Sequence, residues 1–433
     1  MNKNNIKFTF TKYVTLNIIG MMGLSCYILA DTFFIANGIG ESGLAALNLA
    51  IPIYSFINGV GLMIGMGGAT RFTLSKIKNV FTQCIFYGLF VGILFLVIGI
   101  AFSKQLASML GADNITLVNT SVYLKTLMTF SPAFLLNNII LCFVRNDGNP
   151  QLSMIAMILG SFSNIALDYI FIFPLGMGMF GGAFATGIAP IVSLSILSIH
   201  FIKKKNTFVF LKTKFKFKLM LDVTFLGISY LINEVSSGIV IIVFNIIILK
   251  LAGNTAVAAY GIIANIALVV ISIFTGISQG IQPLLSNSYG MQNNEDLKKV
   301  IKYGFATATT ISIVVYIIMI IFADCVIGAF NKDFNIYLAS IAKKGFYIYF
   351  IGFMFIDINI LIATYFTSID NPRNSFIISF SRGFVIIIPM VIILSKLLGL
   401  NGVWMSMPCS ELIVCIISLN MLKKHRLDLI LTN

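Results

Sequence analysis

Four acidic residues stand within long apolar stretches of the sequence: Asp31, Asp168, Glu234 and Asp357. If such stretches cross a membrane, a central aspartate costs at least about 2.5–3.5 kcal/mol on insertion scales. Carboxylates retained at this cost usually face a cavity and mark the path of an ion or a polar substrate. Their chemistry would be the binding of a cation or a proton.

Other oxygen-bearing side chains accompany two of these carboxylates. Asn164 and Asp168 are spaced i, i+4, as are Tyr27 and Asp31, so each pair shares one face of a helix. At 1.5 Å per residue, Asp31 and Asp168 lie roughly 9 Å, and Thr186 roughly 11 Å, from the outer end of their spans, so all three share one depth. These oxygens suit a hard cation such as Na⁺, but they could equally hold a proton. Alternatively, Asn164 and Asp168 only hydrogen-bond neighbouring helices.

Glu234 and Asp357 lie deeper. Counting along the helices places Glu234 roughly 21 Å from the cytoplasmic end of the seventh span and Asp357 roughly 20 Å from the outer end of the tenth span. Both fall in the second half of the chain, where either could attract a cationic substrate or form a second cation site. Glu234 could instead hydrogen-bond to Asn233 or Ser236.

The elements that carry these residues are membrane-spanning helices. Hydrophobic residues make up 58% of the 433 residues and charged residues 10%, whereas a soluble domain carries about 25% charge. A helix of about 20 apolar residues crosses the hydrocarbon layer and satisfies its own backbone. We therefore predict an all-α membrane protein of twelve transmembrane helices, the fourth over residues 119–144, the seventh over 220–250 and the eighth over 255–282.

The two halves of the sequence resemble each other. The segment 147–150 (DGNP) precedes the fifth span, and the segment 370–372 (DNP) precedes the eleventh. Equivalent positions recur after equal numbers of spans, so the repeat is parallel, as in transporters that bind substrate between two halves. We expect two pseudo-symmetric six-helix lobes, residues 1–205 and 219–433, joined by a basic cytoplasmic linker over 206–218.

The net charge of +14 follows from loop topology. Basic residues concentrate in the N-terminus, the C-terminus and the loops between even and odd spans, which the positive-inside rule places in the cytoplasm. Both termini are therefore expected to be cytoplasmic, and nucleic acid is not an expected partner. The alternating Lys and Phe of the segment 203–218 could lie on the anionic inner leaflet or could simply anchor the topology.

Other functional classes find little support in the sequence. A membrane enzyme would need a nucleophile–base pair or metal ligands, but the sequence has no HExxH motif and its two histidines lie near helix ends. The six cysteines form no CxxC pair, so we expect neither a zinc site nor a disulfide framework. A receptor or scaffold would normally carry larger loops. We predict that the protein is not an enzyme and needs no cofactor.

Several short segments, in order, resemble the multidrug and toxic compound extrusion (MATE) family over nearly the full length of the chain. They are ADTFF (30–34), IGESGLAALNLAI (39–51), RNDGN (145–149), NIALD (164–168), GGAFAT (181–186), GIQP (280–283) and NSYG (287–290).

The resemblance implies a two-lobed bacterial plasma-membrane exporter that exchanges Na⁺ or H⁺ for drugs. It also implies that Asp31, Asn164 and Asp168 bind the coupling cation, with Tyr27 and Thr186 in support. Glu234 and Asp357 resemble acids that some members use in the second half, although the match at Asp357 is looser.

The sequence therefore predicts a monomeric efflux antiporter whose partners are small organic cations or drugs and the lipid bilayer. The alternative is a flippase for a lipid-linked precursor, which has a related two-lobed architecture. That function would favour a more cationic cavity, whereas the embedded charges are mainly acidic, with Lys125 and Arg382 as exceptions. The sequence indicates neither the substrate range nor whether Na⁺ or H⁺ is the coupling ion.

Overall fold

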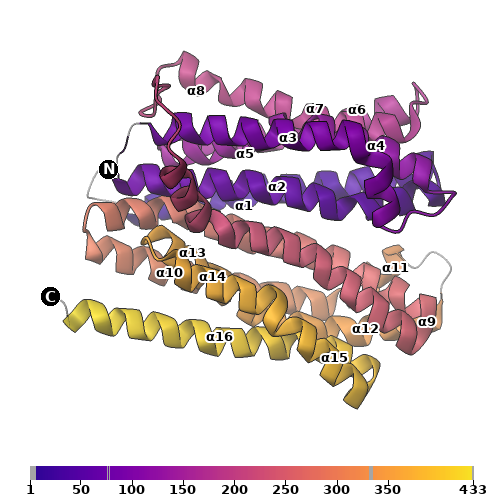
Figure 1. The fold of residues 1–433 in the computed structure, drawn as a ribbon. Coiled ribbons are helices and arrows are strands. Elements are labelled where there is room, and N and C mark those ends of the chain that lie inside the picture. Colours follow the sequence, from indigo (N-terminus) through magenta and orange to yellow (C-terminus); the bar gives the residue numbers. More distant parts are fainter. Residues whose placement is uncertain (1–5, 76, 78, 331–334, 432–433) are drawn as a thin grey trace. The chain divides into compact units, whose positions relative to one another are not determined.

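The computed structural model describes residues 6–75, 77, 79–330 and 335–431, and over these residues the regular elements are helices (Figure 1). The first helices are α1 (Ile6–Gly38), α2 (Glu41–Ser75), α3 (Val80–Met109), α4 (Leu117–Thr129), α5 (Ser131–Asn146), α6 (Pro150–Ile172), α7 (Gly178–Leu197) and α8 (Ile199–Ile202). The later helices are α9 (Phe217–Gly290), α10 (Asn294–Ile321), α11 (Ala323–Phe330), α12 (Ile336–Tyr349), α13 (Phe353–Ser368), α14 (Pro372–Phe380), α15 (Ile387–Leu398) and α16 (Leu400–Leu431). A 3₁₀ turn, η1 (Phe350–Gly352), joins α12 to α13, and a π-helical segment, η2 (Ser381–Val385), follows α14.

The predicted spans can be followed in these helices. Ten described helices are long and apolar enough to cross a membrane, or eleven if α4 and α5, which meet at a 48° bend, form one span. The 74 residues of α9 would extend about 110 Å at 1.5 Å per residue, far beyond the roughly 30 Å hydrocarbon layer. Gly253 interrupts α9 with non-helical backbone angles (φ 72°, ψ −169°). Division at this glycine, which falls between the predicted seventh and eighth spans, brings the count to the twelve predicted.

The fourth span is not the straight helix that a single segment over residues 119–144 suggests. The chain bends between α4 and α5 at Phe130, and Pro132 occupies the first turn of α5. Proline is favoured in the first turn of a helix, because the backbone N–H that it lacks would have no partner there. The same residue prevents continuous hydrogen bonding across the bend.

Contacts between helices divide the chain into two compact units, residues 12–235 and the remainder, with the division inside α9. The lobe boundaries predicted from the repeat rest on internal similarity, and they stay a prediction. In the unit of residues 12–235, α2, α3 and α5 run side by side (Figure 1), and α6 pairs with α7. Glycines allow this approach: a Cβ at Gly65 would lie 2.8 Å from the backbone oxygen of Asn138, and one at Gly92 would lie 2.7 Å from Cα of Pro132. Small residues at helix contacts are typical of membrane bundles.

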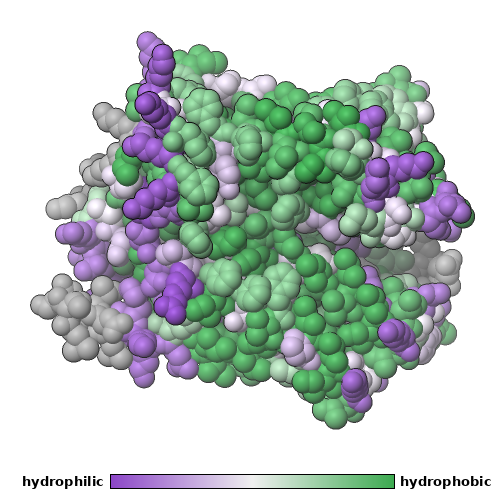
Figure 2. All heavy atoms as spheres, in the orientation of Figure 1, coloured by the Kyte–Doolittle hydropathy of each residue, from purple (hydrophilic) through white to green (hydrophobic). Residues whose placement is uncertain are grey.

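The opposite face of α3 is apolar and exposed. Phe90, Ile93, Leu94 and Val97 follow helical spacing, and each is at least 46% exposed. In Figure 2 the visible middle part of the helices is hydrophobic, and hydrophilic residues gather toward the helix ends. Such a surface would be unstable in water but is favourable against lipid.

The sequence repeat has a local structural counterpart. The side chain of Asn149 accepts a hydrogen bond from the backbone N–H of Leu152 and caps α6, which begins at Pro150. In the same way, Asn371 accepts from the backbone N–H of Asn374 and caps α14, which begins at Pro372. Asparagine caps a helix by accepting from one of its unpaired N–H groups.

Candidate functional site

Three helices of one unit bring together the first set of predicted residues. α1 provides Asp31, α6 provides Asn164 and Asp168, and α7 provides Thr186. All four side chains are buried, with Asn164 and Asp168 fully inaccessible. The arrangement depends on the pairing of α6 with α7, and on Gly182 of α7, whose open side faces Ile35 of α1.

A hydrogen-bond network joins these residues. In the orientation that gives both amide atoms of Asn164 a hydrogen-bond partner, its nitrogen donates to Oδ2 of Asp168 at 3.0 Å. Its oxygen then lies 3.3 Å from Oγ1 of Thr186 and accepts from it. The hydroxyl of Thr186 is also 3.0 Å from the backbone oxygen of Gly182. Asn164 therefore fixes one oxygen of Asp168 and directs the other oxygen away from the amide.

One oxygen of each aspartate is left without a partner. Among the residues that the structure describes, buried Oδ1 atoms of both Asp31 and Asp168 have no hydrogen-bond donor. The charges of the two carboxyl groups act on each other. Two unsatisfied acceptors in one buried site are unfavourable, because each such group costs about 1–3 kcal/mol. A bound cation or proton would remove this cost.

Tyrosines surround the two carboxylates, and of these only Tyr27 was predicted from the sequence. The hydroxyl of Tyr27 pairs with that of Tyr54 on α2 at 2.5 Å. Tyr123 of α4, which is 4% exposed, lies close to both Asp31 and Thr186. Tyr54 and Tyr123 share no motif spacing with the acidic residues. Only the fold brings them to the site.

Glu234 lies in the same unit, on the first part of α9. Its Oε2 accepts from Nδ2 of Asn58 on α2 at 3.4 Å. Asn138 of α5 donates in turn to Oδ1 of Asn58 at 2.8 Å. The negative charge of Glu234 also acts on Tyr54, so polar groups extend from the tyrosine pair to this glutamate.

Asp357 belongs to the other unit, where α13 places it 2% exposed. One carboxylate oxygen accepts from the backbone N–H of Ile358 at 2.6 Å, and Oδ2 has no partner among the described residues. The structure therefore places Glu234 and Asp357 in different units, and each is a separate candidate.

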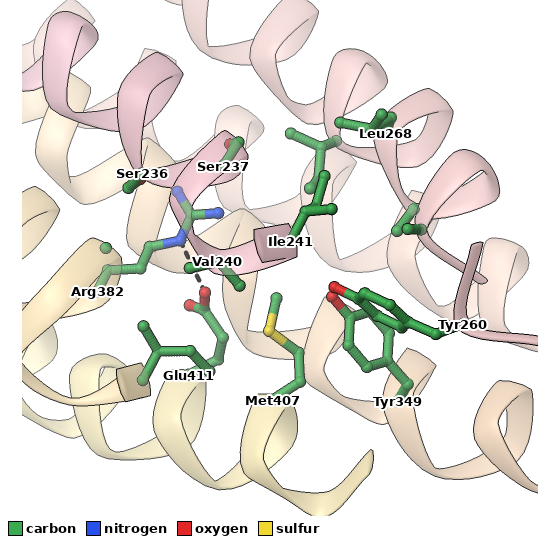
Figure 3. A pocket seen from close by; sticks show the side chains of 15 residues that line it. Ser236, Ser237, Val240, Ile241, Tyr260, Leu268, Tyr349, Arg382, Met407 and Glu411 are labelled. Carbon is green, nitrogen blue, oxygen red and sulfur yellow. Dashed lines mark hydrogen bonds and ion pairs between the residues drawn. The ribbon is translucent and has the colours of Figure 1, made fainter. Parts of the chain in front are cut away.

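The same unit contains a cavity of about 60 Å³ (Figure 3). The guanidinium of Arg382 points into it toward Ser236 and Ser237, and the hydroxyls of Tyr260 and Tyr349 point toward each other across from it. Arg382 donates from Nε to Glu411 at 2.7 Å.

The embedded arginine and glutamate therefore form an ion pair in which Glu411 is buried and Arg382 is partly buried. Nδ2 of Asn359 also donates to Glu411, at 2.8 Å. Arg382 lies within the π-helical segment η2; π-helical turns often occur at functional sites.

No cluster of three or more His, Cys, Asp or Glu side chains with metal-binding geometry occurs among the described residues. His200 is buried and pairs through Nε2 with Asp147 at 2.9 Å. A cation at Asp31 and Asp168 would therefore be held by carboxylate, amide and hydroxyl oxygens, which suit an alkali ion rather than a transition metal.

Many membrane-spanning helices with buried carboxylates inside the spans are typical of membrane transport proteins. Comparison with known families gives the particular class. The family model for MatE matches residues 17–170 and 231–393. The chain belongs to the MatE family, and each of the two matched segments lies mainly in one predicted half.

Characterised relatives cover most of the chain. It is 28% identical over 411 residues to the multidrug export protein MepA of Staphylococcus saprophyticus, with 92% of this chain and 89% of the relative aligned. It is 29% identical over 408 residues to MepA of Staphylococcus aureus, covering 91% and 88%. Both relatives are named multidrug export proteins.

Solved structures confirm the fold. An outward-facing multidrug resistance MATE transporter of the MOP superfamily superposes with a TM-score of 0.91 at 22% identity, covering 100% of this chain and 98% of the other. A MOP superfamily transporter from Pyrococcus furiosus gives a TM-score of 0.87 at 22% identity, covering 96% and 95%. The chain therefore has the predicted all-α, two-lobed membrane fold and is a multi-pass bacterial membrane protein.

Proposed function

We propose that this protein exports organic cations and related drugs in exchange for Na⁺ or H⁺. The observation that carries the proposal is the pair of buried, partnerless Oδ1 atoms on Asp31 and Asp168. Membership of the MatE family and the similarity to multidrug export proteins support an export function.

In the proposed cycle, a cation enters from outside and neutralises Asp31 and Asp168. Its ligands would include Asn164 and Thr186 if the ion is Na⁺, whereas a proton would need only a carboxylate oxygen. Cation binding favours the conformation with low affinity for the drug, and the drug leaves. Coupling requires that the cation bind the two conformations unequally.

The hydroxyls of Tyr27 and Tyr54 lie between the cation site and Glu234 in this proposal. The negative charge of Glu234 would attract an organic cation, and loss of this cation would change the charge near Tyr54. Asp357, with one partnerless oxygen, is the corresponding candidate for a second cation site in the other unit. The transporter works as a monomer with both termini in the cytoplasm.

The flippase alternative would need embedded cations to hold a pyrophosphate. Of the embedded cations Lys125 and Arg382, the side chain of Lys125 is exposed; Arg382 and the fully buried Arg145 both have protein partners. Nη1 of Arg145 donates to Oδ1 of Asn17 at 2.9 Å, and Arg382 pairs with Glu411. These contacts favour the export of organic cations over the flipping of a pyrophosphate-linked lipid.

The test uses purified protein in liposomes loaded with a fluorescent organic cation such as ethidium. A Na⁺ gradient and a pH gradient are imposed in separate experiments. We expect one gradient to drive dye movement, and Asp31→Asn to abolish it. The matched control is Asp324→Asn, because Asp324 is 75% exposed and forms only a surface pair with Lys343.

Undiminished gradient-driven movement in Asp31→Asn would refute the assigned role of the carboxylate. If neither gradient moves any organic cation while a pyrophosphate-linked lipid is translocated, the protein is a flippase.

A further inference from the structure

The basic segment 203–218 follows a fixed, extended path along the start of α3. The hydroxyl of Thr82 accepts from the backbone N–H of Leu211 at 2.9 Å. The buried side chain of Gln83 donates to the backbone oxygen of Lys214 at 2.7 Å and accepts from the backbone N–H of Lys216 at 3.0 Å. Two adjacent side chains of α3 therefore hold the backbone of the segment at several points.

Buried contacts hold the preceding part of the segment. Phe208 is fully buried against the rings of Phe81 and Phe143. Asp147 accepts from the backbone N–H of Thr207 at 2.8 Å and also from its hydroxyl, while it pairs with His200. The segment is therefore anchored to the helices at both of its ends, although residues 205–216 lie outside any helix.

The outward side of this segment is strongly cationic. All seven of its lysines are exposed, namely Lys203, Lys204, Lys205, Lys212, Lys214, Lys216 and Lys218. No acidic residue occurs between positions 203 and 218. Among the residues that the structure describes, none of these lysines forms a salt bridge. The positive charge is therefore available to a partner outside the molecule.

Exposed aromatic rings alternate with the lysines. Phe210, Phe215 and Phe217 are 62%, 57% and 67% exposed. Phenylalanine has no polar atom that would favour water, so the exposure of three rings requires an apolar environment beside the charges. A nucleic acid or an acidic polypeptide would satisfy the lysines but would leave most of this ring surface in water. The boundary between lipid headgroups and acyl chains supplies both environments at once.

We propose that residues 203–218 form a binding surface for anionic phospholipid headgroups at the membrane surface. The lysines contact the headgroups, and the three phenylalanines insert into the acyl boundary. Thr82, Gln83 and Asp147 hold the surface at the ends of the helices, so that the bound lipid contacts the transporter at a defined place. This inference does not depend on the proposed transport cycle.

The test places a reporter in the segment. Phe215→Trp is introduced into the full chain, and the emission of the parent protein, which contains only the buried Trp404, is subtracted. The protein is reconstituted in phosphatidylcholine with an equal part of phosphatidylglycerol, and one of the two lipids is brominated at a time. We expect brominated phosphatidylglycerol to quench the reporter more strongly. A lysine near an anionic surface corresponds to about a fivefold preference.

Two variants that each lose four lysines test whether the lysines of this segment cause the preference for phosphatidylglycerol. Lys212→Gln, Lys214→Gln, Lys216→Gln and Lys218→Gln together should remove the preference. The matched control replaces four other exposed lysines, Lys104, Lys250, Lys298 and Lys302, and should retain it. An unchanged melting temperature in pure phosphatidylcholine verifies folding of both variants. Equal quenching of the parent reporter by the two brominated lipids would overturn the proposal. So would a preference for phosphatidylglycerol that persists when Lys212, Lys214, Lys216 and Lys218 are replaced. A reporter that stays exposed to water in the membrane, and becomes buried only when RNA or an acidic protein is added, would also overturn it.

Discussion

Replacement of Asp31 by Asn should make the protein more stable while it removes ion coupling. Oδ1 of Asp31 is buried without a donor and lies beside the charge of Asp168. Relief of one unsatisfied buried group is worth about 1–3 kcal/mol. An amide at position 31 would carry no charge, and its hydrogens would face the neighbouring carboxylate. For a unit of about 200 residues, each kcal/mol changes the melting temperature by about 2–4 °C.

We therefore expect Asp31→Asn to raise the melting temperature by about 2–12 °C at alkaline pH without Na⁺. The measurement is thermal unfolding of purified protein in detergent, repeated with Na⁺ and at acidic pH. The parent should be stabilised by whichever cation it binds, and the variant should show no such shift. Asp324→Asn controls for the loss of a surface carboxylate. A variant that melts below the parent, or that retains the full ion-dependent shift, would show that Asp31 is satisfied in the protein.

Three further predictions follow from single contacts. A Cβ at Gly227 would lie 1.9 Å from the backbone oxygen of Met63 in α2. Gly227→Ala should therefore lower the free energy of unfolding by at least about 1–3 kcal/mol, measured by thermal unfolding. The control is Gly238→Ala, which should have no such effect because nothing beyond the adjacent backbone of its own helix lies within 4 Å of the added Cβ. Arg382→Met alone should cost about 3–5 kcal/mol in the same assay, because the buried negative charge of Glu411 then keeps only the neutral hydrogen bond from Asn359. Adding Glu411→Met should restore stability. Hydrogen bonds from a threonine hydroxyl and backbone N–H groups hold the pKa of Asp113 below its ordinary value. The ionised Asp113 therefore stabilises the loop between α3 and α4 at pH values above its unfolded-state pKa, and this stabilisation is lost as the pH falls through the folded-state pKa. Amide exchange in this loop, corrected for its intrinsic pH dependence, should accelerate only in that acidic range.

Composition and hydrophobic run length were sufficient to predict the membrane class and the spans. Lipid requires every spanning segment to satisfy its own backbone, so a long apolar run has few structural alternatives. The break at Gly253 falls where the sequence separated the seventh and eighth spans. The bend at Phe130 lies beside Pro132, and a proline within a span predicts a bend because it removes a backbone hydrogen bond, whereas the hydropathy pattern alone reports length and polarity but not direction.

Helical spacing and depth along the spans were enough to predict that Asp31, Asn164, Asp168 and Thr186 lie near one another. That this set binds an ion stays a prediction. Helical spacing predicts which residues share one face, but not which residues on other helices meet them. For this reason Tyr54 and Tyr123 were missed. The same limit applies to Glu234, which was assigned to the second half by position although it accepts a hydrogen bond from Asn58 of α2.

The two repeated halves use their buried acids differently. A Na⁺ ion or a proton at Glu411 would compete with Arg382, and loss of that largely buried ion pair would cost about 3–5 kcal/mol. Asp31 and Asp168 form no salt bridge among the described residues, and each has a partnerless oxygen. A cation therefore gains more free energy from the unit of residues 12–235 than from Glu411. In the other unit Glu411 instead joins α16 to η2, which carries Arg382, so among the acids there Asp357, with its partnerless oxygen, is the one left to bind a cation.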